Sequence, residues 1–294
     1  MRTLIAADGS KHGTAGIVSA CRLLSPFHRR ADLVCVAPKI DQRNSTLQHK
    51  LNRRAARAAV RVAKELAAEG MDVKPAILTG SPVRALAKHS RDYDVTIIGA
   101  KSHNEATAMG LGPVASRLIE HIHASVLVGR DGCNEPAQRI LIPVDGSEVA
   151  LRALEKVNDL LNLSEAEVTL MHVVETPWLH TEADLEAPDE DVAADDLWAD
   201  GEPVPEVQGE FAAEGEAILE AARARLPKRM PVVAMIYEGI PAEQILSEAN
   251  TGGYDLIVLA AAAEADLKHC ILGSVSSKVA WNAPCSVLLV HVND

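Results

Sequence analysis

Short apolar runs alternate with longer amphipathic stretches along the whole chain. The runs, such as residues 94–100 and 286–290, are rich in Val, Ile and Leu, which is typical of parallel strands buried on both faces. Residues 50–69 and 210–225 lie between such runs and are rich in Ala, Leu, Glu and Arg, which favour helix. This alternation of strand and helix predicts an open, doubly wound α/β sheet.

An internal repeat organises these elements. Residues 3–10 (TLIAADGS) recur as residues 140–147 (ILIPVDGS), and residues 94–100 recur as residues 255–261. Three further matches keep the same order along the chain: 31–36 with 168–173, 80–82 with 239–241, and 125–128 with 286–289. The offset grows from 137 to 161 positions, which implies one net insertion of 24 residues. These matches predict a duplicated domain, with a first copy at residues 1–133 and a second copy at residues 137–294.

Each copy has the element order β-α-β-α-β-α-β-α-β. The last strand covers residues 126–130 in the first copy and residues 287–292 in the second. Residues 131–138 between the copies are polar and turn-forming, which predicts a linker. The expected fold class is therefore α/β, with two open parallel-sheet domains in tandem.

The net charge of −12 hides an opposition between the copies. Residues 1–133 carry 20 basic and 11 acidic side chains, whereas residues 134–294 carry 9 basic and 30 acidic ones. Residues 157–222 alone hold 19 Asp or Glu and no Lys or Arg. The insertion, at about residues 175–206, also contains four prolines, which predicts a largely solvated loop. A segment that docks a partner or acts as a lid is the alternative.

Composition excludes several classes of protein. A hydrophobic fraction of 48% is too high for a disordered chain, and an aromatic fraction of 3% requires an aliphatic core. No apolar run reaches the ~18–20 residues of a membrane span, and Asp8 comes too early for a secretory signal. The five cysteines form no CxxC pair, so we expect reduced thiols in a cytoplasmic protein.

Four segments of the second copy carry a family resemblance. They are residues 145–147 (DGS) after a first strand, residues 170–173 (LMHV), residues 239–243 (GIPAE), and residues 273–276 (GSVS) followed by residues 282–290 (NAPCSVLLV). Together they resemble a universal stress protein domain of the UspA superfamily. The resemblance covers nearly the whole chain, twice, apart from the acidic insertion. It implies Rossmann-like, adenine-nucleotide alpha-hydrolase-like domains and a cytoplasmic role in the stress response.

The resemblance also implies how the copies associate. Members of the family pair through their last strands in antiparallel fashion. Residues 126–130 would then pair with residues 287–292 inside one chain and form a pseudo-dimer. Two such chains could associate further as a homodimer, and a regulatory protein is a candidate partner.

A nucleotide loop is the site that the resemblance implies. Some members bind ATP through the pattern G-x2-G-x9-G-[S/T] after the fourth strand, where backbone N–H groups and a helix N-terminus face phosphates. The matching positions are Ala260, Ala263, Gly273 and Ser274 in the second copy, and Gly99, Ser102, Gly112 and Pro113 in the first. Adenine and ribose would be held by the aspartate after the first strand and by backbone at the end of the second: Asp145 and Val173, or Asp8 and Val36.

Neither copy keeps the full pattern. Alanine at 260 and 263 costs about 1 kcal/mol wherever a positive φ is needed, and its methyl group stands where phosphate would approach the backbone. Glu264 and Asp266 repel phosphate in the same loop. In the first copy, Pro113 removes a hydroxyl and an N–H donor. These departures count against a nucleotide in both copies, so no cofactor is established and Mg-ATP stays a candidate only, with the second copy favoured. The alternative is that these turns only connect strand to helix, with Asp8 and Asp145, or the hydroxyls of Ser10 and Ser147, capping the helices.

A basic stripe is the strongest remaining feature of the chain. Six cations recur at helical spacing in residues 43–64: Lys50, Arg53, Arg54, Arg57, Arg61 and Lys64. A solvated face is the first interpretation, and contact with the acidic second copy, within the chain or across a dimer, is the second. Nucleic acid is a distant third, because no aromatic residues interleave with the cations.

Other candidate chemistry is weak. His121 and His123 lack further ligands for a metal, and nothing in the sequence marks the thiol of Cys270, beside His269, as reactive. No catalytic motif is present. The sequence therefore predicts a stress-response protein that binds or regulates rather than a dedicated enzyme. The alternative is an ATP-binding switch or weak ATPase that uses the second-copy crevice.

Overall fold

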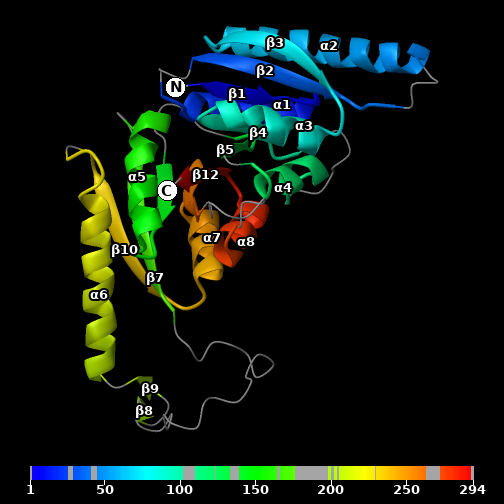
Figure 1. The fold of residues 1–294 in the computed structure, drawn as a ribbon. Coiled ribbons are helices and arrows are strands. Elements are labelled where there is room, and N and C mark those ends of the chain that lie inside the picture. Colours follow the sequence, from blue (N-terminus) through cyan, green and yellow to red (C-terminus); the bar gives the residue numbers. More distant parts are fainter. Residues whose placement is uncertain are drawn as a thin grey trace.

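Ten strands from the two copies form one continuous sheet in the computed structural model (Figure 1). The strand order is β10-β7-β6-β11-β12-β5-β4-β1-β2-β3. The structure describes residues 2–25, 29–40, 45–101, 110–122, 124–132, 139–163, 166–175, 198–199, 202–203, 205–228, 230–262 and 272–292.

The first copy forms the half of the sheet that ends at β3. Its elements follow the order expected from the sequence: β1 (Thr3–Ala6), α1 (Lys11–Leu23), β2 (Arg30–Ala37), α2 (Ser45–Ala68), β3 (Asp72–Thr79), α3 (Pro82–His89), β4 (Val95–Gly99), α4 (Pro113–Ile119) and β5 (Ser125–Gly129). The strand β1 lies at the centre and pairs in parallel with both β2 and β4. The chain therefore leaves β1 toward one edge and returns to its other side, which creates a switch point at the carboxyl ends of β1 and β4.

The second copy repeats this arrangement with one addition. Its elements are β6 (Arg139–Pro143), α5 (Glu148–Leu160), β7 (Glu167–Val174), α6 (Pro205–Arg223), β10 (Val232–Glu238), α7 (Pro241–Thr251), β11 (Leu256–Ala262), α8 (Ser274–Asn282) and β12 (Ser286–Val292). A two-stranded hairpin, β8 (Trp198–Ala199) with β9 (Glu202–Pro203), precedes α6.

The two copies join through their last strands. Val287, Leu288 and Leu289 of β12 lie antiparallel to Val128, Leu127 and Val126 of β5, which is the pairing expected from the sequence. The β5 and β12 residues of this seam are fully buried. A second contact joins the ends of α1 and α5, where the Ser25 N–H donates to the Leu160 carbonyl at 2.9 Å.

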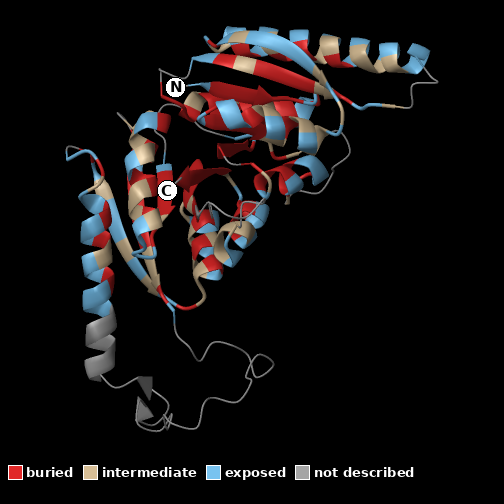
Figure 2. Ribbon diagram, viewed as in Figure 1, coloured by how far each residue is buried: buried red, intermediate tan, exposed pale blue. Residues whose placement is uncertain are grey.

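Helices cover both faces of the sheet and bury two aliphatic cores (Figures 1 and 2). Ile5 of β1 belongs to the core beneath α1 and α2, whereas its neighbours Leu4 and Ala6 belong to the core beneath α3 and α4. Because helices cover both faces of the sheet, successive positions along each strand must be apolar. This explains the unbroken Val, Ile and Leu runs of the sequence.

Two boundaries differ from the sequence expectation. The helix expected at residues 50–69 is α2, Ser45–Ala68, and the helix expected at 210–225 is α6, Pro205–Arg223. The second difference means that part of the presumed acidic loop is helical or lies in the β8–β9 hairpin. Proline suits the first helical position, because its missing N–H has no partner there, so Pro205 marks a helix start and not a loop. The rest of the insertion, from residue 176 to residue 197, lies outside the described residues.

Candidate functional site

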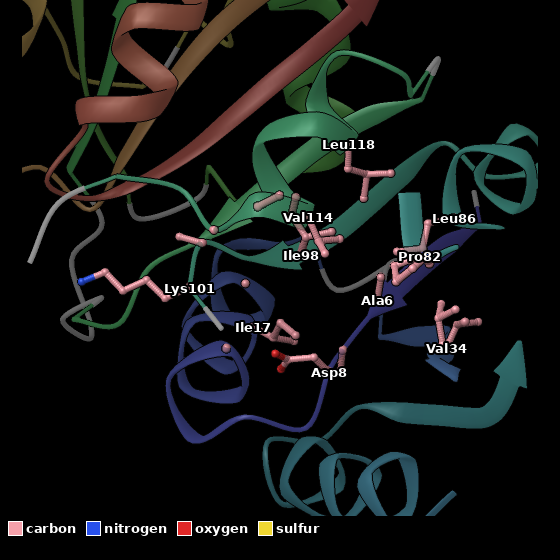
Figure 3. Close-up of a pocket in the computed structure, with 17 residues that line it drawn as sticks. Ala6, Asp8, Ile17, Val34, Pro82, Leu86, Ile98, Lys101, Val114 and Leu118 are labelled. Carbon is pink, nitrogen blue, oxygen red and sulfur yellow. The ribbon is translucent and has the colours of Figure 1, made fainter. Parts of the chain in front are cut away.

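A cavity of about 120 Å³ opens at the switch point of the first copy (Figure 3). It lies at the carboxyl ends of β1, β2 and β4, between α1, α3 and α4. Its lining includes four of the six first-copy positions that the family pattern marks: Asp8, Val36, Gly99 and Gly112. The sheet topology thus brings Val36, Gly99 and Gly112 next to Asp8, although they follow it by 28 to 104 positions in the sequence.

The walls of the cavity are apolar. Val34, Ile98 and Leu118 are buried and line it together with Leu86 of α3 and the half-exposed Val114 of α4. Figure 3 shows the Asp8 carboxylate at the side of these walls and the Lys101 ammonium pointing away from them. Such a lining fits a flat, apolar group with one polar anchor.

Asp8 has a structural role beside its place in the cavity. Its Oδ1 accepts the Ser10 N–H at 2.8 Å, and Ser10 Oγ in turn accepts the Gly13 N–H at 3.0 Å as the N-cap of α1. The second copy repeats this arrangement, where Asp145 accepts the Ser147 N–H at 3.0 Å and Ser147 is the N-cap of α5. The serines therefore cap the helices directly, and the aspartates hold the turns that precede them.

Gly99 permits a close approach between β4 and α1. A Cβ built on Gly99 would lie 2.6 Å from the Gly13 carbonyl oxygen and 2.7 Å from the Gly13 Cα. Its φ does not lie in the left-handed region, so conformational strain does not explain glycine here. The second copy has Ala260 opposite Ala150 at these positions. Gly99 therefore does not need a positive φ, and the close approach of β4 to α1 explains glycine at this position. The effect of alanine at 260 and 263 on a nucleotide loop stays a prediction.

The turn before α4 has lost its hydroxyl donor. Gly112 is the N-cap of α4 without a side-chain cap, and Pro113 occupies the first turn. The Gly112 N–H is already used, because it donates to the Ala100 carbonyl at 2.8 Å. A phosphate at this turn would therefore meet few free donors.

The second copy brings its candidate residues to the corresponding edge. Asp145 follows β6, Val173 lies near the end of β7, Ala260 lies in β11, and Gly273 and Ser274 begin α8. The Ser276 hydroxyl donates to the Ala260 carbonyl at 3.2 Å, which ties α8 to β11. Ala263 lies outside the described residues, as do Ser102, His123, and residues 264–270 with Glu264, Asp266, His269 and Cys270.

The basic stripe on α2 borders a hollow of about 560 Å³. This hollow is next to the cavity, because Asp8 lines both. Arg61 donates to the Gly9 carbonyl. The other lining cations are exposed: Lys50, Arg53, Arg54 and Arg57. Figure 1 places α2 and α6 at opposite edges of the sheet, so the stripe does not contact α6 of its own chain.

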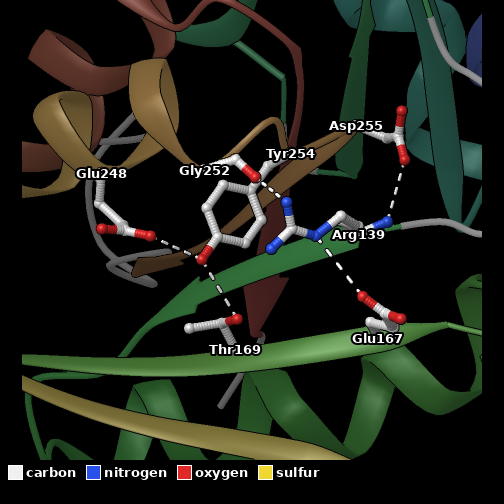
Figure 4. Close-up of polar contacts among 7 residues, drawn as sticks. All are labelled: Arg139, Glu167, Thr169, Glu248, Gly252, Tyr254 and Asp255. Atoms are coloured by element: carbon white, nitrogen blue, oxygen red, sulfur yellow. Dashed lines mark hydrogen bonds and ion pairs between the residues drawn. The ribbon is translucent and has the colours of Figure 1, made fainter.

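A polar cluster that sequence reasoning missed lies at the amino ends of the strands (Figure 4). The Tyr254 hydroxyl bonds to Glu248 Oε1 at 2.8 Å and to Thr169 Oγ1 at 3.2 Å, and the Arg139 guanidinium lies 5.2 Å from the Tyr254 ring centre. The Arg139 N–H donates to Asp255 Oδ2 at 2.9 Å. These contacts fasten β6, β7 and β11 together at the amino ends of the second-copy strands.

The first copy has the same fastening. Arg2 lies 4.6 Å from the Tyr93 ring centre, its N–H donates to Asp94, and the Tyr93 hydroxyl donates to Asp32 at 2.7 Å. Burial and the hydrogen bond to Asp32 raise the pKa of Tyr93 to about 12. The phenol is thus a neutral donor near neutral pH, which suits a structural role. The repeated signal was present in the sequence, since Arg2 matches Arg139 and Tyr93 matches Tyr254.

The described residues offer little reactive chemistry. Burial raises the pKa of Cys21 to about 12 and that of Cys35 to about 11, so both behave as structural thiols. Cys21, Cys35 and Cys285 form no disulfide among the described residues. Within the described ranges no group of three or more His, Cys, Asp or Glu residues could hold a metal ion. The same part of the chain has no helix long and apolar enough to cross a membrane.

Comparison with known proteins gives a consistent result. The model of the universal stress protein family matches residues 1–130 and again residues 136–291. The universal stress protein YxiE of Bacillus subtilis is 29% identical over 154 residues, which cover 52% of this chain and 98% of YxiE. A universal stress protein of Methanothermobacter thermautotrophicus is 32% identical over 163 residues, 53% of this chain and 97% of that protein. The crystal structure of a universal stress protein from Archaeoglobus fulgidus has a TM-score of 0.68 at 18% identity, and the match covers 99% of this chain and 98% of that one.

Proposed function

Because this chain belongs to the universal stress protein family, with two copies of the family's domain in tandem, we propose that it serves the stress response as a regulatory module that binds an adenine nucleotide. The two copies act as a pseudo-dimer joined at β5 and β12, with domain limits near residues 1–133 and 137–294. Free, buried thiols at Cys21 and Cys35 fit a cytoplasmic location.

One observation carries the nucleotide proposal. Four of the residues that the family resemblance marks in the first copy, namely Asp8, Val36, Gly99 and Gly112, line a single apolar cavity whose one carboxylate is that of Asp8. Val34, Ile98 and Leu118 offer surfaces on which a purine can pack, and an aspartate at the edge can accept hydrogen bonds from ribose hydroxyls. The volume of about 120 Å³ suits the base, with the rest of the nucleotide outside.

We propose that the chain binds the nucleotide without hydrolysing it. Hydrolysis would need a positioned base to activate water and donors for the developing charge. The cavity lining contributes Asp8 and Lys101 as its ionisable groups, and Asp8 already accepts the Ser10 N–H. A weak ATPase or an ATP-driven switch is the alternative, with Mg-ATP held by Asp145, Val173, Ala260, Ala263, Gly273 and Ser274 of the second copy.

Filling the cavity should abolish tight nucleotide binding. In Val114→Trp the larger side chain would enter the cavity from α4, whereas Val275→Trp makes the matched change on α8 of the second copy. We expect calorimetric titration of the parent chain with Mg-ATP to give micromolar affinity, about −8 kcal/mol. Val114→Trp should weaken this affinity by about tenfold or more, which is at least ~1.4 kcal/mol, and Val275→Trp should leave it unchanged.

The same pair of variants identifies other outcomes. Parent affinity weaker than millimolar would refute nucleotide binding altogether. Loss of binding in Val275→Trp alone would move the site to the second copy, which the sequence favoured. Phosphate release during the titration, measured separately, would support the ATPase alternative.

Charge complementarity supports self-association as the partner proposal. The cations of α2 lie at one edge of the sheet, and the exposed carboxylates Glu214, Glu216 and Glu220 of α6 lie at the other. Contact between them therefore requires two chains arranged head to tail. A regulatory protein with an acidic face could use the same stripe, and nucleic acid is the least favoured partner.

Neutralising the stripe should reduce association at low salt. The triple variant Arg53→Gln, Arg54→Gln and Arg57→Gln should sediment as a smaller species than the parent at low ionic strength, where exposed charges are least screened. The control removes three exposed cations from the α3 region (Arg84→Gln, Lys88→Gln and Arg91→Gln) and should leave the sedimentation of the chain at low ionic strength unchanged. Deletion of residues 182–206 should also reduce association. A parent chain that stays monomeric at low salt would contradict this proposal, and a gel shift with DNA or RNA would favour nucleic acid.

A further inference from the structure

A second cavity, of about 140 Å³, lies where the two copies meet. His12, Lys101 and Arg130 of the first copy line it, together with Asp131 and with Pro284 from the second copy. It adjoins the nucleotide cavity described above, because Ala100 and Lys101 line both. No family position discussed so far accounts for it.

Arg130 is the unusual member of this cavity. It follows β5 and is only 8% exposed. Its Nη1 donates to the Gly110 carbonyl at 3.2 Å, and its Nη2 donates to the carbonyls of Ala280 and Trp281 at 3.1 and 3.3 Å. Its backbone N–H donates to Ser286 Oγ at 3.1 Å. The side chain thus reaches from the first copy to the last turn of α8 in the second.

The charge of Arg130 is poorly compensated. The acceptors of its guanidinium are neutral carbonyls, and its buried Nε has no hydrogen-bond partner. Burial lowers its pKa, and the nearby Cys285 opposes this effect. A buried guanidinium without a carboxylate partner is costly, so an incoming anion would gain from filling this role.

Lys101 adds a second positive charge to the lining, and Asp131 is the one carboxylate among the lining residues. The exposed His12 also borders the cavity and can donate a hydrogen bond. Asp131 is itself exposed, so water screens it more than it screens Arg130. The cavity therefore favours a small, highly charged anion over a neutral ligand.

We propose that this interface cavity is a phosphate subsite, which receives the phosphate groups of a nucleotide whose base occupies the neighbouring first-copy cavity. This inference rests on the proposed function. Pro113 leaves the turn before α4 without a hydroxyl and short of an N–H donor, so phosphates need donors elsewhere. Lys101 lines both cavities and points away from the apolar walls of the first one (Figure 3), and Arg130 lines the second cavity with it.

The subsite would also connect the two copies. Arg130 binds the α8 carbonyls with Nη2 and also lines the cavity, so its positive charge would act on an anion held there. Arginine suits this double task, because its five donors lie in a fixed plane and point in different directions. A phosphate held there would be recognised by groups from the first copy within a cavity closed by the second. A single copy alone would not complete it.

The test compares adenosine, ATP and tripolyphosphate by calorimetric titration of the full chain. With the parent chain we expect ATP to bind about tenfold or more tighter than adenosine, and tripolyphosphate to bind measurably on its own. Arg130→Met keeps an apolar stem but removes the donors. It should bring ATP down to the affinity of adenosine and abolish tripolyphosphate binding, with adenosine unaffected. Arg117→Met removes an exposed cation of α4 that lines neither cavity and should change none of the three affinities.

A milder variant keeps the test valid if Arg130→Met does not fold. His12→Gln changes an exposed side chain and should weaken ATP and tripolyphosphate about threefold, with adenosine unchanged. Equal affinity of the parent for adenosine and ATP, without tripolyphosphate binding, would overturn the phosphate subsite and leave the nucleotide proposal intact. Tripolyphosphate binding that depends on Arg130, without adenosine binding, would support the subsite and refute the nucleotide proposal. If adenosine, ATP and tripolyphosphate all fail to bind, both the phosphate subsite and the nucleotide proposal are refuted.

Discussion

Replacing Gly129 by alanine is expected to lower the free energy of unfolding by about 3 kcal/mol, at the upper end for overpacking. A Cβ at this position would overlap the Gly16 carbonyl and would lie 2.9 Å from the Ala20 Cβ. A Cβ on Gly16 would in turn overlap the Gly129 carbonyl. Because backbone faces backbone, no flexible side chain can move aside, and α1 must separate from β5. Urea unfolding followed by circular dichroism measures the loss.

Gly273 provides the matched control. A Cβ there would have no atom of the described residues within 4 Å, and its φ is −59°. Gly273→Ala should therefore change the free energy of unfolding by less than ~1 kcal/mol. If Gly129→Ala costs no more than this control, the α1–β5 approach relaxes easily and the close backbone contact is not a determinant of the fold.

The arrangement of the sheet could be predicted because the sequence repeats the same order of strands and helices in both copies. Matches between residues 3–10 and 140–147, and between 94–100 and 255–261, identify first and fourth strands in both copies. Apolar runs without alternation indicate burial on both faces, and the order of elements then leaves few topologies. The antiparallel contact of β5 with β12 followed from the family resemblance, and the structure contains it.

The close helix–strand contacts could not be predicted in the same way. Whether Gly99 faces Gly13, or Gly129 faces Gly16, depends on distances between elements that the chain order does not encode. The burial of Arg130 is a similar case, since an arginine at a strand end is usually exposed. The polar clusters around Tyr93 and Tyr254 were predictable in principle, because Arg2 aligns with Arg139 and Tyr93 aligns with Tyr254. The assignment of Ala263 to a nucleotide loop stays a prediction.

Replacing Leu288 by aspartate should produce the largest loss of stability, about 4 kcal/mol, because it buries an unpaired charge. Leu288 lies directly opposite Leu127 at the centre of the β5–β12 pair, and both are fully buried. Opposed Cβ atoms in such a pair lie about 4.5–5.5 Å apart, so the carboxylate would face an aliphatic side chain. Urea unfolding should change from one transition to two as the copies separate.

Two controls make this result specific. Leu288→Met conserves volume and should cost less than ~1.5 kcal/mol, whereas Val60→Asp places the same charge on the exposed face of α2 and should cost less than ~0.5 kcal/mol. A single transition in Leu288→Asp with a loss below ~1.5 kcal/mol would contradict an essential seam.

The same variant bears on function, because the seam adjoins the phosphate subsite at the end of β5 and the start of β12. Ser286, which accepts the Arg130 N–H, begins β12 two positions before Leu288. If the copies part, Arg130 loses its α8 acceptors and the cavity loses Pro284, whereas the apolar nucleotide cavity is built from the first copy alone. At urea concentrations where the first copy stays folded, Leu288→Asp should therefore bind ATP no more tightly than adenosine. Preference for ATP that survives separation of the copies would show that the phosphates bind within the first copy, and that duplication of the domain is not needed for nucleotide recognition.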